Sequence, residues 1–228
     1  MLECGPASKV GSERERVKML RTIVEKTLFY RDGDKTFFEP EEFPWVARIE
    51  SGSKSIRREL DALMVRREEI PNFQDVSKAQ RALTEGDQWK TFFLSTFGGK
   101  KIEENCARCP ETVRLLQNIP GLRQSMFSIL APRKHIPPHR GPYKGLLRYH
   151  LGLMIPGPEG SCRIRVGNNL RSWKEGKSII FDDSNEHEVW NDTDSYRVVL
   201  FVDFVRPTIF PLSMANRTII WARGQYPL

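Results

Sequence analysis

Cysteines are few in this sequence, and long apolar runs are missing. Its 228 residues include four cysteines, too few for the disulfide framework that stabilises small secreted domains. No uncharged apolar run reaches the roughly 18 residues needed to span a bilayer, and residues 1–10 contain no apolar signal core. We therefore expect a globular protein of the cytoplasm.

The excess of positive over negative charge is also small. The chain has 36 Lys and Arg against 29 Asp and Glu, a formal charge of +7, and both signs mix in the helix-like segments. Basic residues interleaved with aromatics, the pattern of RNA-binding strands, are missing, so we expect no nucleic-acid partner. The segment from Phe204 to Leu228 differs, because it contains Arg206, Arg217 and Arg223 and no acid.

Hydrophobic residues make up 39% of the chain, enough for a sizeable core. In residues 1–120 the apolar residues recur mainly at helical intervals. Ser12 and Glu15 match a capping box that would open a helix, and a second apolar stripe predicts a helix at about residues 53–68. We expect this region to pack on the core rather than to fold independently.

Two further segments of the N-terminal region have distinct patterns. Residues 34–50 contain prolines among aromatics and predict an irregular connector, whereas residues 88–97 predict a strand. Pro110 suits the first position of a short helix that ends near residue 120.

Residues 121–210 indicate β-structure. Five short segments rich in β-branched and aromatic residues are separated by Gly, Pro and Asn clusters, which is typical of a sandwich or a jelly roll. The five segments are 125–131, 146–155, 162–166, 178–182 and 195–204. The sequence therefore predicts a mainly β protein with N-terminal helices.

Two histidines of the β-rich half are candidate metal ligands. His139 lies in a Pro-rich turn before a strand, and His187 follows a short apolar strand. Histidines at the mouths of neighbouring strands can form an open metal site, and imidazole suits iron, copper, nickel or zinc. A single histidine, however, is more often a packed or surface residue.

Strand periodicity predicts that further polar side chains share one face of a strand. Arg148 shares a face with His150, and Arg197 shares a face with Asp203. Burying the Arg197 charge among apolar neighbours costs several kcal/mol unless a carboxylate meets it. That carboxylate could be Asp203, or it could belong to a ligand, since a guanidinium binds a carboxylate through two parallel hydrogen bonds.

Several segments, in order and at matching spacing, resemble the aspartyl/asparaginyl β-hydroxylase family. They are HIPPHRGPYKGLLRYHLGLMIP, CRIRV, IIFDDSNEHEVWNDT and YRVVLFVDFVRP. The resemblance covers residues 125–207 and continues weakly through residues 89–98 and 105–116, whereas residues 1–80 contribute little to it. Members of this family are Fe(II)- and 2-oxoglutarate-dependent oxygenases with a double-stranded β-helix core, a cupin-like jelly roll. The resemblance therefore implies this fold and the hydroxylation of an unactivated C–H bond by dioxygen.

The same resemblance assigns roles to individual residues. It makes His139 and His187 the iron ligands, and it makes Arg197 the partner of the distal carboxylate of 2-oxoglutarate. The other cosubstrate-binding positions that it implies are Ser128, Arg148 and His150. Strand periodicity and the resemblance thus select the same arginines and histidine.

Position 141 lacks the acidic ligand of most such oxygenases. The usual pattern is His-x-Asp/Glu, but here Gly141 follows His139 and Arg140. The animal branch of the family also has glycine there and is understood to use two histidines and water. Asp182 or Asp183 could instead supply the third ligand, or these residues could simply cap the turn before His187.

The substrate is less defined than the cofactors. The family acts on Asp or Asn side chains, on amino acids and on acyl chains of lipids, so an Asp/Asn-like β-carbon is the first expectation and a lipid acyl chain the alternative. Leu146 stands where the animal enzymes carry a second arginine, which argues against their type of protein substrate. A non-catalytic cupin-like binding protein is the alternative of another class.

The family resemblance does not account for two features of the sequence. Cys106 and Cys109 form a single CxxC, which is weak evidence for a metal or redox site and is better explained by packing. Residues 211–228 form an apolar, basic tail with a helical pattern. Such a helix could lie on a membrane surface, or it could pack on the β core or a second subunit.

Overall fold

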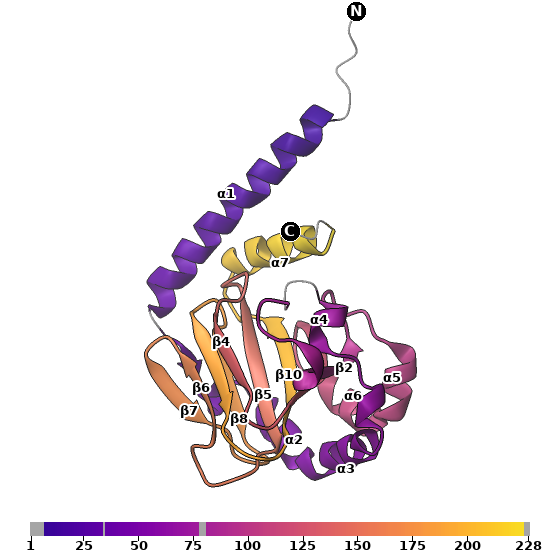
Figure 1. Ribbon diagram of the computed structural model, residues 1–228. Helices are drawn as coiled ribbons and strands as arrows, with labels where there is room; N and C mark the ends of the chain where they lie inside the picture. Colours follow the sequence, from indigo (N-terminus) through magenta and orange to yellow (C-terminus); the bar gives the residue numbers. More distant parts are fainter. Residues whose placement is uncertain (1–6, 34, 78–80, 226–228) are drawn as a thin grey trace, which may run out of the picture.

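Two antiparallel β-sheets form the centre of the molecule, and helices cover its outside (Figure 1). The computed structural model describes residues 7–33, 35–77 and 81–225. The larger sheet has six strands in the order β1 (Phe37–Phe38), β8 (Ser178–Phe181), β5 (Leu146–Met154), β10 (Arg197–Val205), β3 (Leu122–Leu130) and β2 (Trp89–Ser95). The smaller has four in the order β4 (His135–His139), β9 (His187–Asn191), β6 (Cys162–Val166) and β7 (Asn169–Ser172). This arrangement is a double-stranded β-helix, so the predicted fold class is confirmed.

The central strand β10 shows why these residues form a sheet with two buried faces. Alternate side chains from Val198 to Phe204 point to a cluster beneath the helices, while Val199 and Phe201 point to a second cluster between the sheets. A strand covered on both faces has a nearly continuous apolar sequence. Arg197 begins the strand on the face toward the smaller sheet, and Asp203 interrupts the apolar run on that face.

Helices cover the outer face of the larger sheet. Ile56 and Leu60 of α3 and Leu115 of α6 pack there against strand residues such as Leu200. The helices are α1 (Ala7–Asp32), α2 (Val46–Ser51), α3 (Ser53–Met64), α4 (Phe73–Val76), α5 (Glu103–Arg108), α6 (Pro110–Leu116) and α7 (Leu212–Gln225), with 3-10 turns η1 (Pro40–Glu42), η2 (Arg67–Glu69) and η4 (Gly86–Gln88). None of the helices in the described ranges is long and apolar enough to cross a membrane.

The N-terminal region also contributes strands. β1 and β2 form the two edges of the larger sheet, and β2 confirms the strand predicted at residues 88–97. The irregular connector predicted at residues 34–50 is wrong, because β1, η1 and α2 lie there. The first helix begins at Ala7 rather than Ser12, and α3 ends at Met64, four residues before the predicted end.

His139 ends a strand rather than lying in a turn before one. β4 is an edge strand that contains two prolines and pairs only with β9 among the named strands. Proline cannot donate a ladder hydrogen bond and is tolerated at edges. The prolines therefore disguised this short strand in the sequence.

α7 packs against α1 at one end of the sheets, and α1 extends away from the body (Figure 1). Val24 and Leu28 of α1 and Ile219 and Ile220 of α7 are buried in one cluster, which also contains Tyr143. Of the alternatives left open for the tail, packing on the protein thus holds along one side of α7. Its other side stays exposed, with Trp221 at 66%.

We expect Ile219→Ala to lower the free energy of unfolding by about 2–5 kcal/mol, because the buried side chain leaves a cavity. Trp221→Ala in the same helix should change it by less than about 0.5 kcal/mol, since this side chain is exposed. Urea denaturation followed by circular dichroism measures both values. Equal effects of the two substitutions would contradict the packing of α7.

Candidate functional site

The two candidate metal ligands lie side by side between neighbouring strands. His139 of β4 is paired in register with His187 of β9, and their ring centroids are 4.1 Å apart. Nδ1 of His139 lies 2.9 Å from the Pro137 carbonyl, and Nδ1 of His187 lies 3.0 Å from the Asn185 carbonyl. A carbonyl only accepts, so each Nδ1 donates and each Nε2 keeps its lone pair. This is the tautomer that metal-bound histidines use.

Burial keeps both rings neutral. It lowers the pKa of His139, and it lowers the pKa of His187 to about 3, with further contributions from His139 and Arg148. Neutral imidazole is the form that binds metal. The pair is therefore ready to bind a metal ion across the neutral pH range.

Neither aspartate before His187 completes a three-ligand cluster. Within residues 7–33, 35–77 and 81–225, no group of three His, Cys, Asp or Glu side chains could hold a metal ion. Asp182 accepts hydrogen bonds from Lys144 and Arg206, both at 2.8 Å, and Asp183 forms an ion pair with Arg148 at 2.8 Å. In the described part of the chain, these contacts thus pair both aspartates with cations rather than with the two histidines. Asp182 also caps the turn, since it accepts from the backbone N–H of Ser184.

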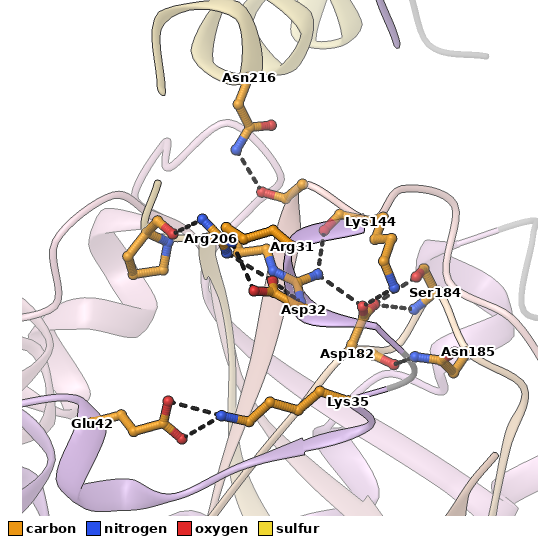
Figure 2. A network of polar contacts seen from close by, with 12 residues as sticks. Arg31, Asp32, Lys35, Glu42, Lys144, Asp182, Ser184, Asn185, Arg206 and Asn216 are labelled. Carbon is orange, nitrogen blue, oxygen red and sulfur yellow. Dashed lines mark hydrogen bonds and ion pairs between the residues drawn. The ribbon is translucent and has the colours of Figure 1, made fainter. Parts of the chain in front are cut away.

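A buried polar network fixes the segment that carries His187. Figure 2 shows Asp182 between Lys144 and Arg206, with Ser184 on its other oxygen. Arg206, which is 1% exposed, forms a second ion pair at 2.8 Å with Asp32 at the end of α1. The network thus ties the end of α1 and the end of β10 to the turn between β8 and β9.

Asp183 also explains the glycine at position 141. The Gly141 N–H donates to the Asp183 carbonyl at 2.7 Å, and a Cβ on Gly141 would lie 2.0 Å from Oδ2 of Asp183. The Asp183 carboxylate is held by Arg148 and has little freedom to move away. Only glycine fits at position 141 without disturbing this pair.

We expect Gly141→Asp to lower activity rather than to improve it, although it creates a His-x-Asp pattern. The new side chain must displace Asp183 from Arg148, which breaks a buried ion pair. Turnover should fall by roughly tenfold or more, and the melting temperature should fall with it. A several-fold gain in turnover would contradict this expectation.

Arg197 is a buried cation, and no carboxylate in the described part of the chain forms an ion pair with it. It is 2% exposed, its Nε and Nη1 have no hydrogen-bond partner, and its guanidinium lies 4.7 Å from the Trp173 ring centroid. Burial lowers its pKa to about 10. The alternative of an Arg197–Asp203 pair is wrong, because six residues along a strand separate the two by about 20 Å.

Asp203 instead pairs with Arg148, which lies directly opposite it in the sheet. Their closest atoms are 2.8 Å apart, and Asp183 contacts the same guanidinium. Burial alone would lower the pKa of Arg148, but the two carboxylates raise it above its ordinary value. Arg148 is therefore already neutralised within the protein, unlike Arg197.

His150 also lies buried without polar partners. Neither ring nitrogen has a hydrogen-bond partner, and the ring packs on Trp173, Phe181 and Phe201 at centroid distances of 5.7, 5.1 and 5.1 Å. Burial, followed by Arg148 and Arg197, lowers its pKa well below the ordinary value. The ring is thus neutral, and two buried nitrogens are left for a ligand.

Ser128 faces the same space from β3. It lies opposite Val199, two residues along β10 from Arg197, and its hydroxyl accepts a hydrogen bond from Trp89 Nε1 at 2.9 Å. The sequence did not single out the aromatic residues around these groups. Trp173 in particular contacts both Arg197 and His150, and its place shortly before the segment IIFDDSNEHEVWNDT was the signal that could have identified it.

The CxxC does not contribute to this site. Cys106 and Cys109 are buried under the helices. Burial raises the pKa of the Cys106 thiol and raises that of Cys109 to about 12. Such thiols are poor nucleophiles at neutral pH, which supports a packing role.

These features define a jelly-roll protein with a two-histidine candidate metal site and an unpaired arginine buried between its sheets. The model of the Aspartyl/Asparaginyl beta-hydroxylase family matches residues 50–207, and the chain belongs to this family. The match begins at residue 50, so it extends further toward the N-terminus than the motifs indicated.

Two sequence relatives and one solved structure are similar to this chain. An ornithine lipid ester-linked acyl 2-hydroxylase of Rhizobium tropici is 49% identical over 184 residues, which are 81% of this chain and 65% of that protein. The human aspartyl/asparaginyl beta-hydroxylase is 44% identical over 134 residues, which are 57% of this chain and 17% of that protein. A Pseudomonas putida prolyl-4-hydroxylase structure matches with a TM-score of 0.44 and 13% identity, covering 68% of this chain and 88% of that chain. The chain therefore spans less than two thirds of the length of these two sequence relatives.

Proposed function

We propose that the chain is an Fe(II)- and 2-oxoglutarate-dependent dioxygenase that hydroxylates an unactivated C–H bond. The observation that carries the proposal is the buried, unpaired guanidinium of Arg197. Such a charge costs several kcal/mol unless a ligand neutralises it, and a dicarboxylate supplies the matching group. Family membership supports the same conclusion.

The residues of the site fit iron and 2-oxoglutarate. His139 and His187 would hold Fe(II) through Nε2, since both Nδ1 atoms are engaged by carbonyls. Arg197 and the Ser128 hydroxyl would bind the distal carboxylate, and the neutral His150 ring would donate to the cosubstrate. When bound, iron and 2-oxoglutarate activate dioxygen and yield succinate, carbon dioxide and a hydroxylated product.

The protein contributes binding, orientation and exclusion of water. Phe181 and Phe201 make the inner face apolar, which strengthens the pairing of Arg197 with a carboxylate. Arg148 is held between Asp183 and Asp203, so it serves to fix Asp183 beside Gly141 rather than to bind the cosubstrate with its charge. No side-chain general base is needed.

We propose the acyl chain of a lipid as the substrate. The Rhizobium tropici relative is an ornithine lipid ester-linked acyl 2-hydroxylase by name, and it is the more similar of the two sequence relatives. Leu146, where the animal enzymes carry a second arginine, is a poor partner for an acidic or amide side chain. An Asp or Asn side chain is the second candidate. The cytoplasmic location expected from the sequence stays a prediction.

A substrate comparison tests the proposal. Purified protein with Fe(II), ascorbate, 2-oxoglutarate and dioxygen is incubated with acyl lipids or with Asp/Asn peptides, and mass spectrometry detects the gain of one oxygen atom. We expect succinate formation to rise with the lipids and their acyl chains to gain oxygen. Oxidised peptides and unchanged lipids would refute the lipid substrate, and the absence of succinate under all conditions would favour a non-catalytic binding protein.

A further inference from the structure

α1 carries apolar side chains on two opposite sides. Val24 and Leu28 are buried against α7, whereas Met19, Ile23 and Tyr30 are 63%, 54% and 85% exposed. The exposed three follow each other at spacings of four and seven residues, which places them on one side of the helix. One side therefore packs in the fold, and the other is left in solvent.

α7 and the residues before it repeat this pattern. Ile219 and Ile220 are buried, while Phe210, Met214 and Trp221 are 73%, 62% and 66% exposed. Because α1 and α7 pack their inner sides into the same cluster, the outer side of each helix faces away from that cluster, and both helices lie at one end of the sheets (Figure 1). Large exposed apolar side chains on the outer sides of packed helices mark an interaction surface.

The charges around these side chains are mainly positive. Lys18, Lys26 and Arg217 are exposed beside the apolar residues, and no acid lies between Asp203 and the end of the described chain at residue 225. The exposed Glu15 lies on α1, where Glu25 is half-buried and pairs with Arg21 at 3.2 Å. Aromatic and aliphatic groups interspersed with Lys and Arg are typical of helices that lie in the interface of an anionic membrane.

We propose that the outer sides of α1 and α7, defined by Met19, Ile23, Tyr30, Phe210, Met214 and Trp221 and here named the docking face, bind the surface of an anionic bilayer. A second copy of the chain is the less suitable partner, because it would bring like charges together in a protein of net charge +7. An anionic lipid surface neutralises them. The sequence indicated a membrane-surface helix in the C-terminal tail alone, whereas the fold adds the outer side of α1 as a second candidate surface.

The docking face borders a pocket whose lining includes residues of the loops next to the candidate metal site. This pocket of about 550 Å³ is lined by Phe29 and Tyr30 of α1, and on its other side by Gly141 and Ser184. Gly141 lies two residues after His139, and Ser184 lies three residues before His187. Docking would thus hold a membrane next to the loops that carry both histidines. The inference concerns binding and does not depend on the proposed reaction.

Vesicle sedimentation tests the inference on the full chain without iron or 2-oxoglutarate. Vesicles contain either equal parts of phosphatidylglycerol and phosphatidylcholine or phosphatidylcholine alone. We expect binding to the anionic vesicles that weakens with added salt. The double variants Phe210→Ser/Trp221→Ser and Ile23→Ser/Tyr30→Ser should each bind roughly tenfold more weakly, and Arg217→Glu about fivefold more weakly.

Val65→Ser/Leu170→Ser is the matched control, because these side chains are 79% and 58% exposed but lie outside the docking face. It should bind as the unaltered protein does, and all variants should keep its melting temperature. Failure of the unaltered protein to bind anionic vesicles at low salt would overturn the inference. So would equal losses in the control and docking variants, or a dimer that the docking variants dissociate without any vesicle binding. Because no turnover is measured, each of these outcomes leaves the proposed reaction untouched.

Discussion

Replacing His139 or His187 by alanine is expected to abolish turnover and iron binding while the fold is retained. In the proposed site each residue would supply one of two protein ligands, and no third carboxylate is placed to compensate within the described residues. The loss of turnover should be roughly 100-fold or more, since even residues that only orient metal ligands contribute 10–100-fold. Succinate formation measures turnover, and equilibrium dialysis with Fe(II) measures metal binding.

His135 provides the matched control within the same strand. Its side chain is exposed, stacks on Trp190 at 5.0 Å and pairs with Glu188 at 2.9 Å. His135→Ala should therefore keep both iron binding and turnover. Turnover above a few per cent in His139→Ala or His187→Ala would exclude the assignment, as would an equal loss in the control.

Replacing Arg197 by methionine should have opposite effects on stability and on cosubstrate binding. Without ligand, the free energy of unfolding should rise by about 1–4 kcal/mol, because an unpaired buried charge is replaced by an apolar side chain of similar length. Binding of 2-oxoglutarate should weaken roughly 100-fold, since the partner of its distal carboxylate is lost. Urea denaturation measures the first effect, and the rise of melting temperature with added 2-oxoglutarate measures the second.

Arg148→Met is the contrasting variant. Arg148 contacts both Asp183 and Asp203, so its removal breaks two buried ion pairs and should cost about 3–5 kcal/mol of stability. If Arg197→Met destabilised the protein to a similar extent, Arg197 would have a structural partner and the cosubstrate assignment would fail. The same conclusion would follow if added 2-oxoglutarate raised the melting temperature of Arg197→Met as much as that of the unaltered protein.

Local sequence patterns were enough to predict most strands in the β-rich half of the protein. The strands β3, β5, β6, β8 and β10 lie within about three residues of the predicted segments, because their apolar runs are bounded by turn residues. Strand periodicity also placed Arg197 and His150 on the inner faces. The short strands β4, β7 and β9 were missed, since two prolines or polar residues hide their pattern and only pairing with neighbours stabilises them.

The sequence by itself determined the fold class, the two candidate iron ligands and the buried arginine, because these depend on residue type, spacing and periodicity along single segments. Only the tertiary structure decided how the charges are paired. Arg197 and Asp203 share a face of one strand, yet the carboxylate meets Arg148 on the neighbouring strand. Likewise, Asp183 fills the space beside Gly141 from a different loop. Such contacts join residues far apart in the chain, and their distances arise from sheet register and packing, which no single segment contains.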